Sequence, residues 1–240
     1  VMVPKDWLTL LENMVAQVRA GEIPEARIDE AVRRILTVKF KSGLMDRGLP
    51  SKRAAQFTNM IGAEAHRELA RDAVRRSLVL MKDPGGLLPL DPAGTYRIAG
   101  AGADDIGLQS GGWTISWQGT GNVNADFPGA RSILDGFVQH AQTAGGDVAL
   151  YDPDETVSQL DAAIMVMAEA PYAEGQGDIE TLAWQQGRTR DLNLIRQFSE
   201  QGIPVITIFL TGRPLWVNAE LNASYAFVIA WLPGSEGHAV

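Results

Sequence analysis

Cysteine is absent from the 240 residues of this chain. Its absence excludes a disulfide framework and every metal site built on thiolates. Basic runs are also missing: Lys and Arg number 21 against 29 Asp and Glu, which gives a formal net charge of −8. Because nucleic-acid binding depends on clustered basic side chains, we expect no nucleic-acid partner. No apolar run is long enough to cross a bilayer, so we expect no membrane partner.

Signatures of metal, nucleotide and serine-hydrolase chemistry are lacking as well. The three histidines, His66, His140 and His238, match no metal-ligand spacing, and no Ser/His/Asp order appears. His66 and His140 fall in helical patterns, where we expect them to be solvated. The segment 100–103 has the glycines of a phosphate-binding turn, but acidic residues follow it and would repel a pyrophosphate.

The first part of the chain is predicted to be helical. Apolar residues recur at helical spacing from Trp7 to Val18 and from Ile28 to Leu36. Gly21 ends the first helix and Pro24 opens the second. Turn-forming residues over 43–51 then interrupt the pattern, so we predict a helical hairpin followed by a linker. Because the hairpin leaves its apolar faces uncovered, we expect them to pack on a further part of the protein.

The rest of the chain alternates between strand and helix patterns. A helix is predicted over 63–76, and an apolar run at 78–81 ends in a turn. Buried-strand segments then alternate with amphipathic helices at 132–144 and 191–201; the strands are 96–101, 148–151, 162–167, 205–210 and 226–232. Apolar strands alternating with helices predict an α/β fold, with a mostly parallel sheet covered by helices on both faces. Ligands of such sheets bind in the loops that follow the strands.

Two of those loops have an unusual composition. Trp113 follows two glycines, which permit an exposed bend, and an exposed indole ring suits the apolar face of a sugar. Trp117, in the same loop, is interpreted as a packing anchor. In the second loop Glu169 directly follows a strand, where the sheet fixes its position, as a catalytic carboxylate requires. Glu174 and Asp178 lie farther along among glycines, and a solvated acidic loop is the alternative interpretation.

Two further loops are interpreted as structural turns. Residues 232–237 have the pattern of a strand-to-helix turn with Ser235 as its N-cap. Residues 211–214 form a second turn, in which Arg213 is assigned a structural role.

Several stretches together resemble glycoside hydrolase family 3, in its exo-1,3/1,4-β-glucanase and β-glucosidase branch. They occur in the family's order and spacing along nearly the whole chain: 1–4, 33–36, 66–70, 77–82, 87–90, Gly111-Gly112-Trp113-Thr114, Glu169-Ala170-Pro171-Tyr172 and 231–237. Members of this kind have a (β/α)₈ barrel, a linker and a six-stranded α/β sandwich, with the active site between the two domains. The barrel supplies an aspartate nucleophile, and the sandwich supplies a glutamate acid/base and an aromatic wall.

The resemblance implies a division of the chain and a set of site residues. Residues 1–44 correspond to the last helices of the barrel domain, 45–61 to the linker, and 62–240 to a C-terminally truncated sandwich lacking its sixth strand. Glu169 is then the acid/base of a retaining enzyme, and Trp113 and Tyr172 bind substrate. No cofactor or metal is implied. The implied partners are β-glucosides or β-glucan oligosaccharides and the N-terminal barrel of the same polypeptide.

The sequence departs from the family pattern at three places, and two other kinds of function remain open. Asp6 lies at a helix start after Val-Pro and does not match the nucleophile motif, so we expect the nucleophile upstream of this chain. Ser110 stands where a cysteine is common, and Ala168 where a glycine often precedes the acid/base. The alternatives are a non-catalytic carbohydrate-binding or interaction module, and a β-xylosidase or β-N-acetylhexosaminidase of the same family. We expect both ends to be internal to a longer protein, which is periplasmic or secreted.

Overall fold

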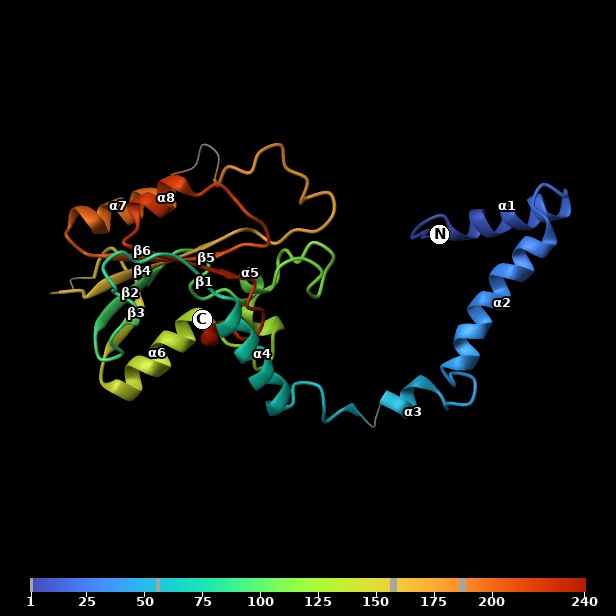
Figure 1. The fold of residues 1–240 in the computed structure, drawn as a ribbon, viewed down its shortest axis with the longest axis horizontal. Helices are drawn as coiled ribbons and strands as arrows, with labels where there is room; N and C mark the ends of the chain where they lie inside the picture. Colours follow the sequence, from blue (N-terminus) through green and yellow to red (C-terminus); the bar gives the residue numbers. More distant parts are fainter. Residues whose placement is uncertain (1, 55–56, 156–158, 186–188) are drawn as a thin grey trace. The chain divides into compact units, whose positions relative to one another are not determined.

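The computed structural model describes residues 2–54, 57–155, 159–185 and 189–240. The chain divides into two compact units, Val1–Gly62 and Ala63–Val240 (Figure 1). Val1, in the first of the family stretches, and residues 55–56 of the expected linker lie outside the described residues. Among those described, no helix combines the length and apolar character needed to cross a membrane.

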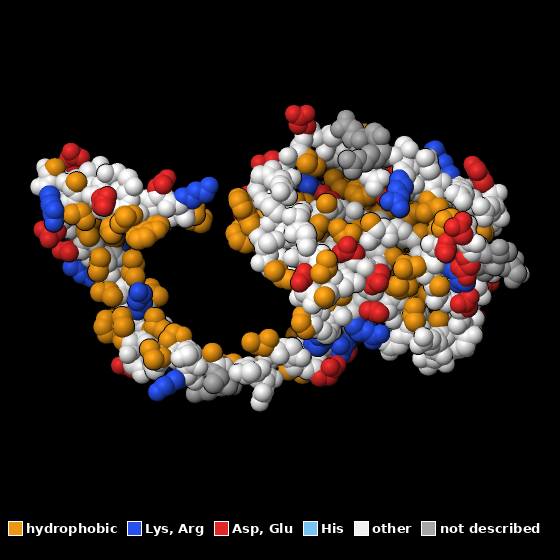
Figure 2. Space-filling model, turned by 180° about the vertical axis from the view of Figure 1, so that it is seen from behind, with side chains coloured by type: hydrophobic (Ala, Val, Ile, Leu, Met, Phe, Trp, Pro, Cys, Tyr) orange, Lys and Arg blue, Asp and Glu red, His pale blue; other side chains and the backbone are white. Residues whose placement is uncertain are grey.

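The first unit contains the two helices that the sequence predicts and a third, short one. Its helices are α1 (Trp7–Arg19), α2 (Glu25–Lys41) and the short α3 (Pro50–Ala54). The chain leaves α1 at Gly21, whose φ of +75° is the left-handed conformation that glycine adopts without a steric penalty. No residue of these three helices is buried. Hydrophobic side chains are instead visible along the surface of this unit (Figure 2), and Trp7 and Ile35 are 61% and 57% exposed.

The second unit is built on one six-stranded sheet, in the order β1-β6-β5-β4-β2-β3. Its strands are β1 (Val79–Lys82), β2 (Thr95–Ala99), β3 (Asp147–Leu150), β4 (Ala162–Ala168), β5 (Val205–Leu210) and β6 (Ala226–Trp231). All neighbouring strands are parallel except β1, which pairs antiparallel with β6. The expectation of a sheet one strand short is therefore wrong, because the apolar run at 78–81 forms the edge strand.

Helices cover both faces of this sheet, as an α/β sandwich requires (Figure 1). Helices α4 (Glu64–Ser77) and α6 (Ile133–Ala144) lie on one face, and α7 (Arg190–Glu200) and α8 (Asn218–Ala223) on the other. Helix α6 starts with a capping box: the Asp135 N–H donates to Ser132 Oγ at 3.2 Å, and the Ser132 N–H donates to Asp135 Oδ2 at 2.8 Å. The elements between strands and helices are α5 (Ile106–Ser110) and two 3₁₀ turns, η2 (Asn124–Asp126) and η3 (Gly237–Ala239).

The central strands are buried on both faces, as their continuous apolar sequences predict. Alternate residues of β4 pack in two separate clusters, because successive side chains of a strand point to opposite faces. Ile164 and Val166 join the cluster that includes Ile133 of α6, whereas Met165 joins the cluster that includes Ile195 of α7. The predicted inward residues of the 191–201 helix, Leu192, Ile195 and Phe198, are all buried.

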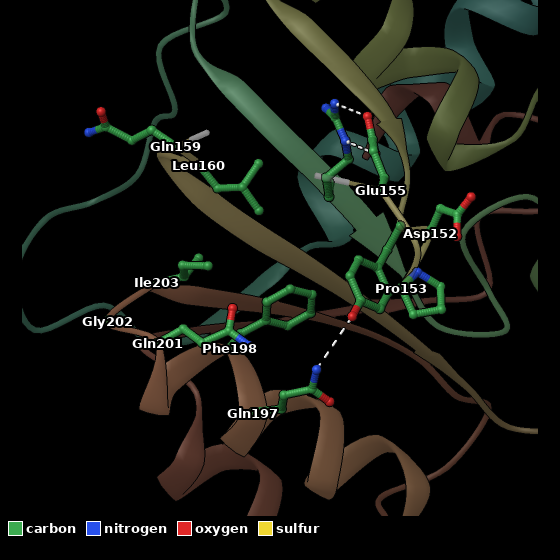
Figure 3. A pocket seen from close by; sticks show the side chains of 12 residues that line it. Asp152, Pro153, Glu155, Gln159, Leu160, Gln197, Phe198, Gln201, Gly202 and Ile203 are labelled. Carbon is green, nitrogen blue, oxygen red and sulfur yellow. Dashed lines mark hydrogen bonds and ion pairs between the residues drawn. The ribbon is translucent and has the colours of Figure 1, made fainter. Parts of the chain in front are cut away.

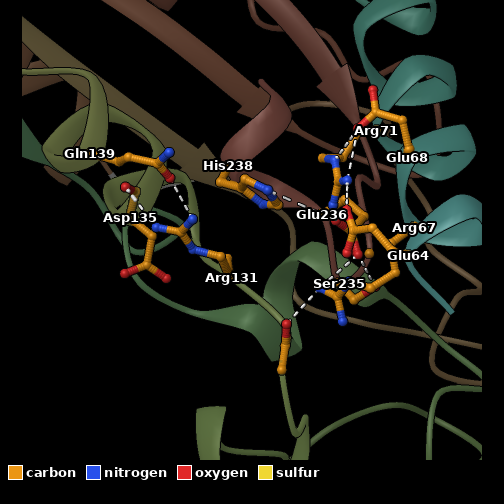
Figure 4. Close-up of polar contacts among 12 residues, drawn as sticks. Glu64, Arg67, Glu68, Arg71, Arg131, Asp135, Gln139, Ser235, Glu236 and His238 are labelled. Atoms are coloured by element: carbon orange, nitrogen blue, oxygen red, sulfur yellow. Dashed lines mark hydrogen bonds and ion pairs between the residues drawn. The ribbon is translucent and has the colours of Figure 1, made fainter. Parts of the chain in front are cut away.

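The turn after β6 is held by a buried carboxylate. Glu236, 2% exposed, pairs with Arg67 Nη2 at 2.8 Å and with Arg71 Nη1 at 3.4 Å, both on α4 (Figure 4). The assignment of Ser235 as a helix N-cap is wrong: the 3₁₀ turn begins at Gly237, and the Ser235 hydroxyl donates to Glu236 at 3.2 Å. Because Arg67 and Arg71 pair with the buried Glu236, the arginine side of α4 faces the turn after β6. Leu69 on the same helix is 69% exposed.

Candidate active site

The loops that carry the candidate residues meet where the strand order reverses. The chain passes from β2 outward to β3, then returns to β4 on the other side of β2 and continues through β5 to β6. The loops after β2 and β4 begin at this point, and ligands of an open α/β sheet usually bind in the crevice there, beyond the carboxyl ends of the strands.

Glu169 follows β4 directly and is fixed by groups that follow β5. Its N–H donates to the carbonyl of Leu210 at 2.9 Å, which continues the pairing of the two strands. The Thr211 hydroxyl donates to Oε2 at 2.9 Å, and Arg213 Nε donates to Oε1 at 2.6 Å. The Glu169 side chain is 12% exposed. Both carboxylate oxygens thus have a set position at the mouth of the crevice.

Arg213 connects Glu169 to the wall of the site. Its guanidinium lies 3.7 Å from the centre of the Tyr172 ring, and its Nη1 donates to the carbonyl of Gly177 at 2.6 Å. Burial, and then the negative charge of Glu169, raise the pKa of the Tyr172 hydroxyl, which is therefore protonated at neutral pH. Arg213, to which the sequence assigns a structural role in a turn, thus contacts the candidate catalytic carboxylate itself.

Two tryptophans belong to the loop between α5 and η2, which follows β2 in the chain. Trp113 is 71% exposed and Trp117 is 55% exposed, so the expectation that Trp113 is the more exposed is confirmed. The interpretation of Trp117 as a packing anchor is wrong. Its indole N–H donates to Glu174 Oε2 at 2.7 Å, and the N–H of Trp113 donates to the same oxygen at 3.1 Å.

The three residues singled out from the sequence line one cavity. Trp113, Glu169 and Tyr172 border a cavity of about 250 Å³, closed by Gly111, Gly112, Ala170, Pro171, Gly212 and Leu232. The close approach of the two loops depends on Gly112, where a Cβ atom would lie 1.9 Å from the carbonyl oxygen of Tyr172. The cavity therefore combines a fixed carboxylate with an aromatic wall.

A model of the glycosyl hydrolase family 3 C-terminal domain matches residues 78–240 of this chain. The chain belongs to glycosyl hydrolase family 3. A lysosomal β-glucosidase of Dictyostelium discoideum is 32% identical to it over 98% of this chain and 30% of that protein. A β-xylosidase of Formosa agariphila is 28% identical over 86% of this chain and 30% of that protein.

A solved structure extends this likeness over both units. The crystal structure of an exo-1,3/1,4-β-glucanase from a Pseudoalteromonas species is 48% identical, with a TM-score of 0.94, over 99% of this chain and 30% of that one. The present chain spans about a third of the length of the curated relatives it matches. The six-stranded sandwich is thus that of a family 3 C-terminal domain.

A larger cavity in this family 3 domain lacks comparable chemistry among its described residues. It has a volume of about 550 Å³ and lies between α7 and the segment after β3 (Figure 3). Its carboxylates are bonded as Glu169 is, since Glu155 pairs with Arg97 at 2.8 Å and Asp152 accepts from the N–H of Asp154 at 2.9 Å, but no tryptophan is among its described lining residues. Size alone therefore does not choose the site, and the smaller cavity at Glu169 remains the candidate.

Proposed function

We propose that this chain supplies the general acid/base and the aromatic subsite wall of a retaining, exo-acting β-glucosidase or exo-β-glucanase. Glu169 is the acid/base, and Trp113 and Tyr172 contact the substrate, a β-glucoside or β-glucan oligosaccharide. The observation that carries the proposal is the fixed position of Glu169: the sheet holds its backbone, and Thr211 and Arg213 hold its two oxygens beside an exposed aromatic wall. The similarity to β-glucosidases and an exo-β-glucanase supports it.

The reaction needs a second carboxylate, which we place in a barrel domain of the same polypeptide. Residues 1–44 are then the last helices of that barrel, 45–61 the linker, and 62–240 the sandwich. In the first step the nucleophile attacks the anomeric carbon while Glu169 donates a proton to the leaving oxygen. In the second step Glu169 removes a proton from the water that releases the sugar. A retaining enzyme requires the two carboxyl groups to lie about 5–5.5 Å apart.

The contacts of Glu169 match its role in the second step. A guanidinium and a hydroxyl hydrogen bond both engage the ionised carboxylate, which is the form that accepts a proton from water. Before the first step, the carboxyl group must take up a proton and turn its oxygen toward the glycosidic bond. Arg213 is therefore a positioning residue that holds Glu169 between turnovers.

Two other functions make different predictions. A non-catalytic carbohydrate-binding module would use the aromatic wall without Glu169 chemistry. A β-xylosidase or a β-N-acetylhexosaminidase would use the same acid/base on another sugar, and the similarity to a β-xylosidase gives the first of these a specific basis. Hydrolysis rates on matched glucosides, xylosides and N-acetylglucosaminides separate these candidates.

The test of the acid/base assignment is Glu169→Ala in the full-length enzyme. A general acid contributes about 10²–10⁴-fold, so hydrolysis of cellobiose should fall by that factor. A dinitrophenyl glucoside needs no protonation of its leaving group, so its glycosyl-enzyme should still form rapidly. Added azide should then speed turnover and yield β-glucosyl azide, because azide attacks without a general base.

The matched control is Glu180→Ala, which removes an exposed carboxylate from the same loop. It should leave both substrates unaffected. If Glu174→Ala shows azide rescue and Glu169→Ala does not, the assignment is wrong. If neither variant affects hydrolysis, neither glutamate is the acid/base, and a domain without a catalytic glutamate replaces the proposal.

A further inference from the structure

The Glu174 carboxylate joins the loops that follow β2 and β4. Its Oε2 accepts hydrogen bonds from the indole N–H groups of Trp113 and Trp117. An indole N–H only donates, and a carboxylate oxygen has lone pairs for two donors, so one glutamate satisfies both rings. The rings lie with their centres 6.3 Å apart and their planes tilted by 47°.

The backbone around Glu174 is fixed by a neighbouring amide side chain. Gln118 Nε2 donates to the Glu174 carbonyl at 2.8 Å, and Gln118 Oε1 accepts from the N–H of Ala173 at 2.7 Å. Together with the two indole bonds, these contacts cross between the two loops. Because the Gln118 pair holds the backbone, the Glu174 side chain has a defined direction although it is exposed.

The tryptophan loop adopts a conformation that needs outside support. Trp113 has φ of +58° and Ile115 has φ of +62°, in the left-handed region that residues with a Cβ atom rarely adopt. For the β-branched Ile115 this is a marked outlier. Such conformations persist where surrounding contacts hold them, and they occur often at ligand-binding sites. Here the N–H of Trp113 donates to the carbonyl of Trp117 at 2.9 Å, and the Glu174 carboxylate binds both rings.

We propose that Glu174 is a positioning residue that holds the Trp113 and Trp117 rings as a platform for the leaving-group sugar of a β-linked oligosaccharide. The inference rests on the proposed function, since it names how that site selects its substrate. Trp113 presents its ring to solvent because its polar edge is bound by Glu174. Rigid rings lose less entropy when a sugar binds, so the bridge favours substrates with a second sugar ring.

The first test compares two substrates of the full-length enzyme with Glu174→Ala. With cellobiose, whose second ring would stack on the platform, kcat/KM should fall about tenfold, mainly through KM. With β-glucosyl fluoride, which has no second ring, kcat/KM should stay within about twofold. Glu174→Gln retains an acceptor oxygen and should recover most of the loss, and Glu180→Gln should behave as the unmodified enzyme. An equal fall on both substrates, or no change on cellobiose, would overturn the proposal.

The second test measures the bridge without using catalysis. In the 240-residue chain, the indole N–H protons of Trp113 and Trp117 should exchange with solvent more slowly than that of Trp216, which is 67% exposed. Glu174→Ala should abolish the difference for both rings, and Glu180→Ala should not. If the bridge is present but the enzyme hydrolyses no β-glucoside, the proposed function fails and the bridge stands. If exchange is unaffected by Glu174→Ala, the bridge itself is refuted.

Discussion

The two units of the chain contain helices of similar sequence pattern but with opposite burial. Helices α1 and α2 have regular apolar faces, yet none of their residues is buried within the described structure. In the second unit α7 buries Leu192, Ile195 and Phe198 against the sheet. The difference shows that apolar periodicity specifies a helix, whereas burial requires a second layer to pack on. Substitutions of apolar residues should therefore change the free energy of unfolding much more in the second unit than in the first.

The largest contrast is expected between two phenylalanines. Phe209 is 1% exposed on β5 and has ring contacts with Trp184 and Phe227, whereas Phe40 on α2 is 62% exposed. Phe209→Ala leaves a cavity in a close-packed core and should destabilise the second unit by about 3–5 kcal/mol. Phe40→Ala removes no buried contact and should change stability by about 0.5 kcal/mol or less.

Urea unfolding followed by near-ultraviolet circular dichroism measures both variants of this pair. A loss for Phe40→Ala as large as that for Phe209→Ala would show that α2 is packed in solution. Such a result would mean that apolar side chains of the two units do not differ in burial.

Ion pairs provide a second, smaller contrast. Glu236 is buried between two arginines, whereas Glu30 on α2 has a side chain 45% exposed beside Arg34 and Arg27. Glu236→Gln removes the buried charge that pairs with Arg67 and Arg71 and should cost about 2–3 kcal/mol. Glu30→Gln breaks a solvent-exposed pair and should cost about 0.5 kcal/mol or less.

Salt dependence sharpens this second comparison. The small effect of Glu30→Gln should vanish in about 1 M NaCl, because salt screens exposed charges, while most of the Glu236→Gln effect should remain. Equal costs for the two variants at low salt would contradict the buried character of the Glu236 pairs.

The smallest expected effect is a pH dependence confined to the second unit. Burial, and then the positive charge of Arg131, lower the pKa of His238, although Glu236 opposes the shift (Figure 4). The unfolded chain therefore binds this proton at a higher pH than the folded chain does. Stability should fall as the pH drops below the ordinary value of 6.5 toward the lowered pKa of His238.

Urea midpoints between about pH 7.5 and about pH 5 test the His238 effect. His238→Asn should flatten the part of the slope that this histidine causes. His140→Asn, at an exposed position of α6, is the matched substitution. An unchanged slope in His238→Asn would show that other groups carry the pH dependence.

Much of the fold follows from local patterns in the sequence. Residues 205–210 are predicted as a strand with the bounds that β5 has, because a fully buried strand is apolar throughout. The antiparallel pairing of β1 could not be predicted in this way. The apolar run at 78–81 is compatible with a strand at either edge of the sheet and in either direction. The short helix α8 escapes prediction, because its six residues carry too few apolar positions for a periodic pattern.

The candidate site also has residues that the local sequence predicts and contacts that it does not. Glu169 is recognisable because it directly follows an apolar strand, and Trp113 because two glycines precede it. The contact of Arg213 with Glu169 is not predictable, because it depends on β5 lying beside β4, which no local pattern specifies. The role of Glu174 is equally hidden, since its two tryptophan partners lie 57 and 61 residues earlier in the chain.

Local sequence is enough to specify the helices, the buried strands and the carboxylate at the end of β4, because each depends on residues close together in the chain. Which side chains meet is a property of the folded molecule. Hydrogen bonds and ion pairs such as Arg213–Glu169 and Trp117–Glu174 need atoms within about 3 Å of each other. That proximity is set by the strand order β5-β4-β2, which brings together loops from distant parts of the sequence.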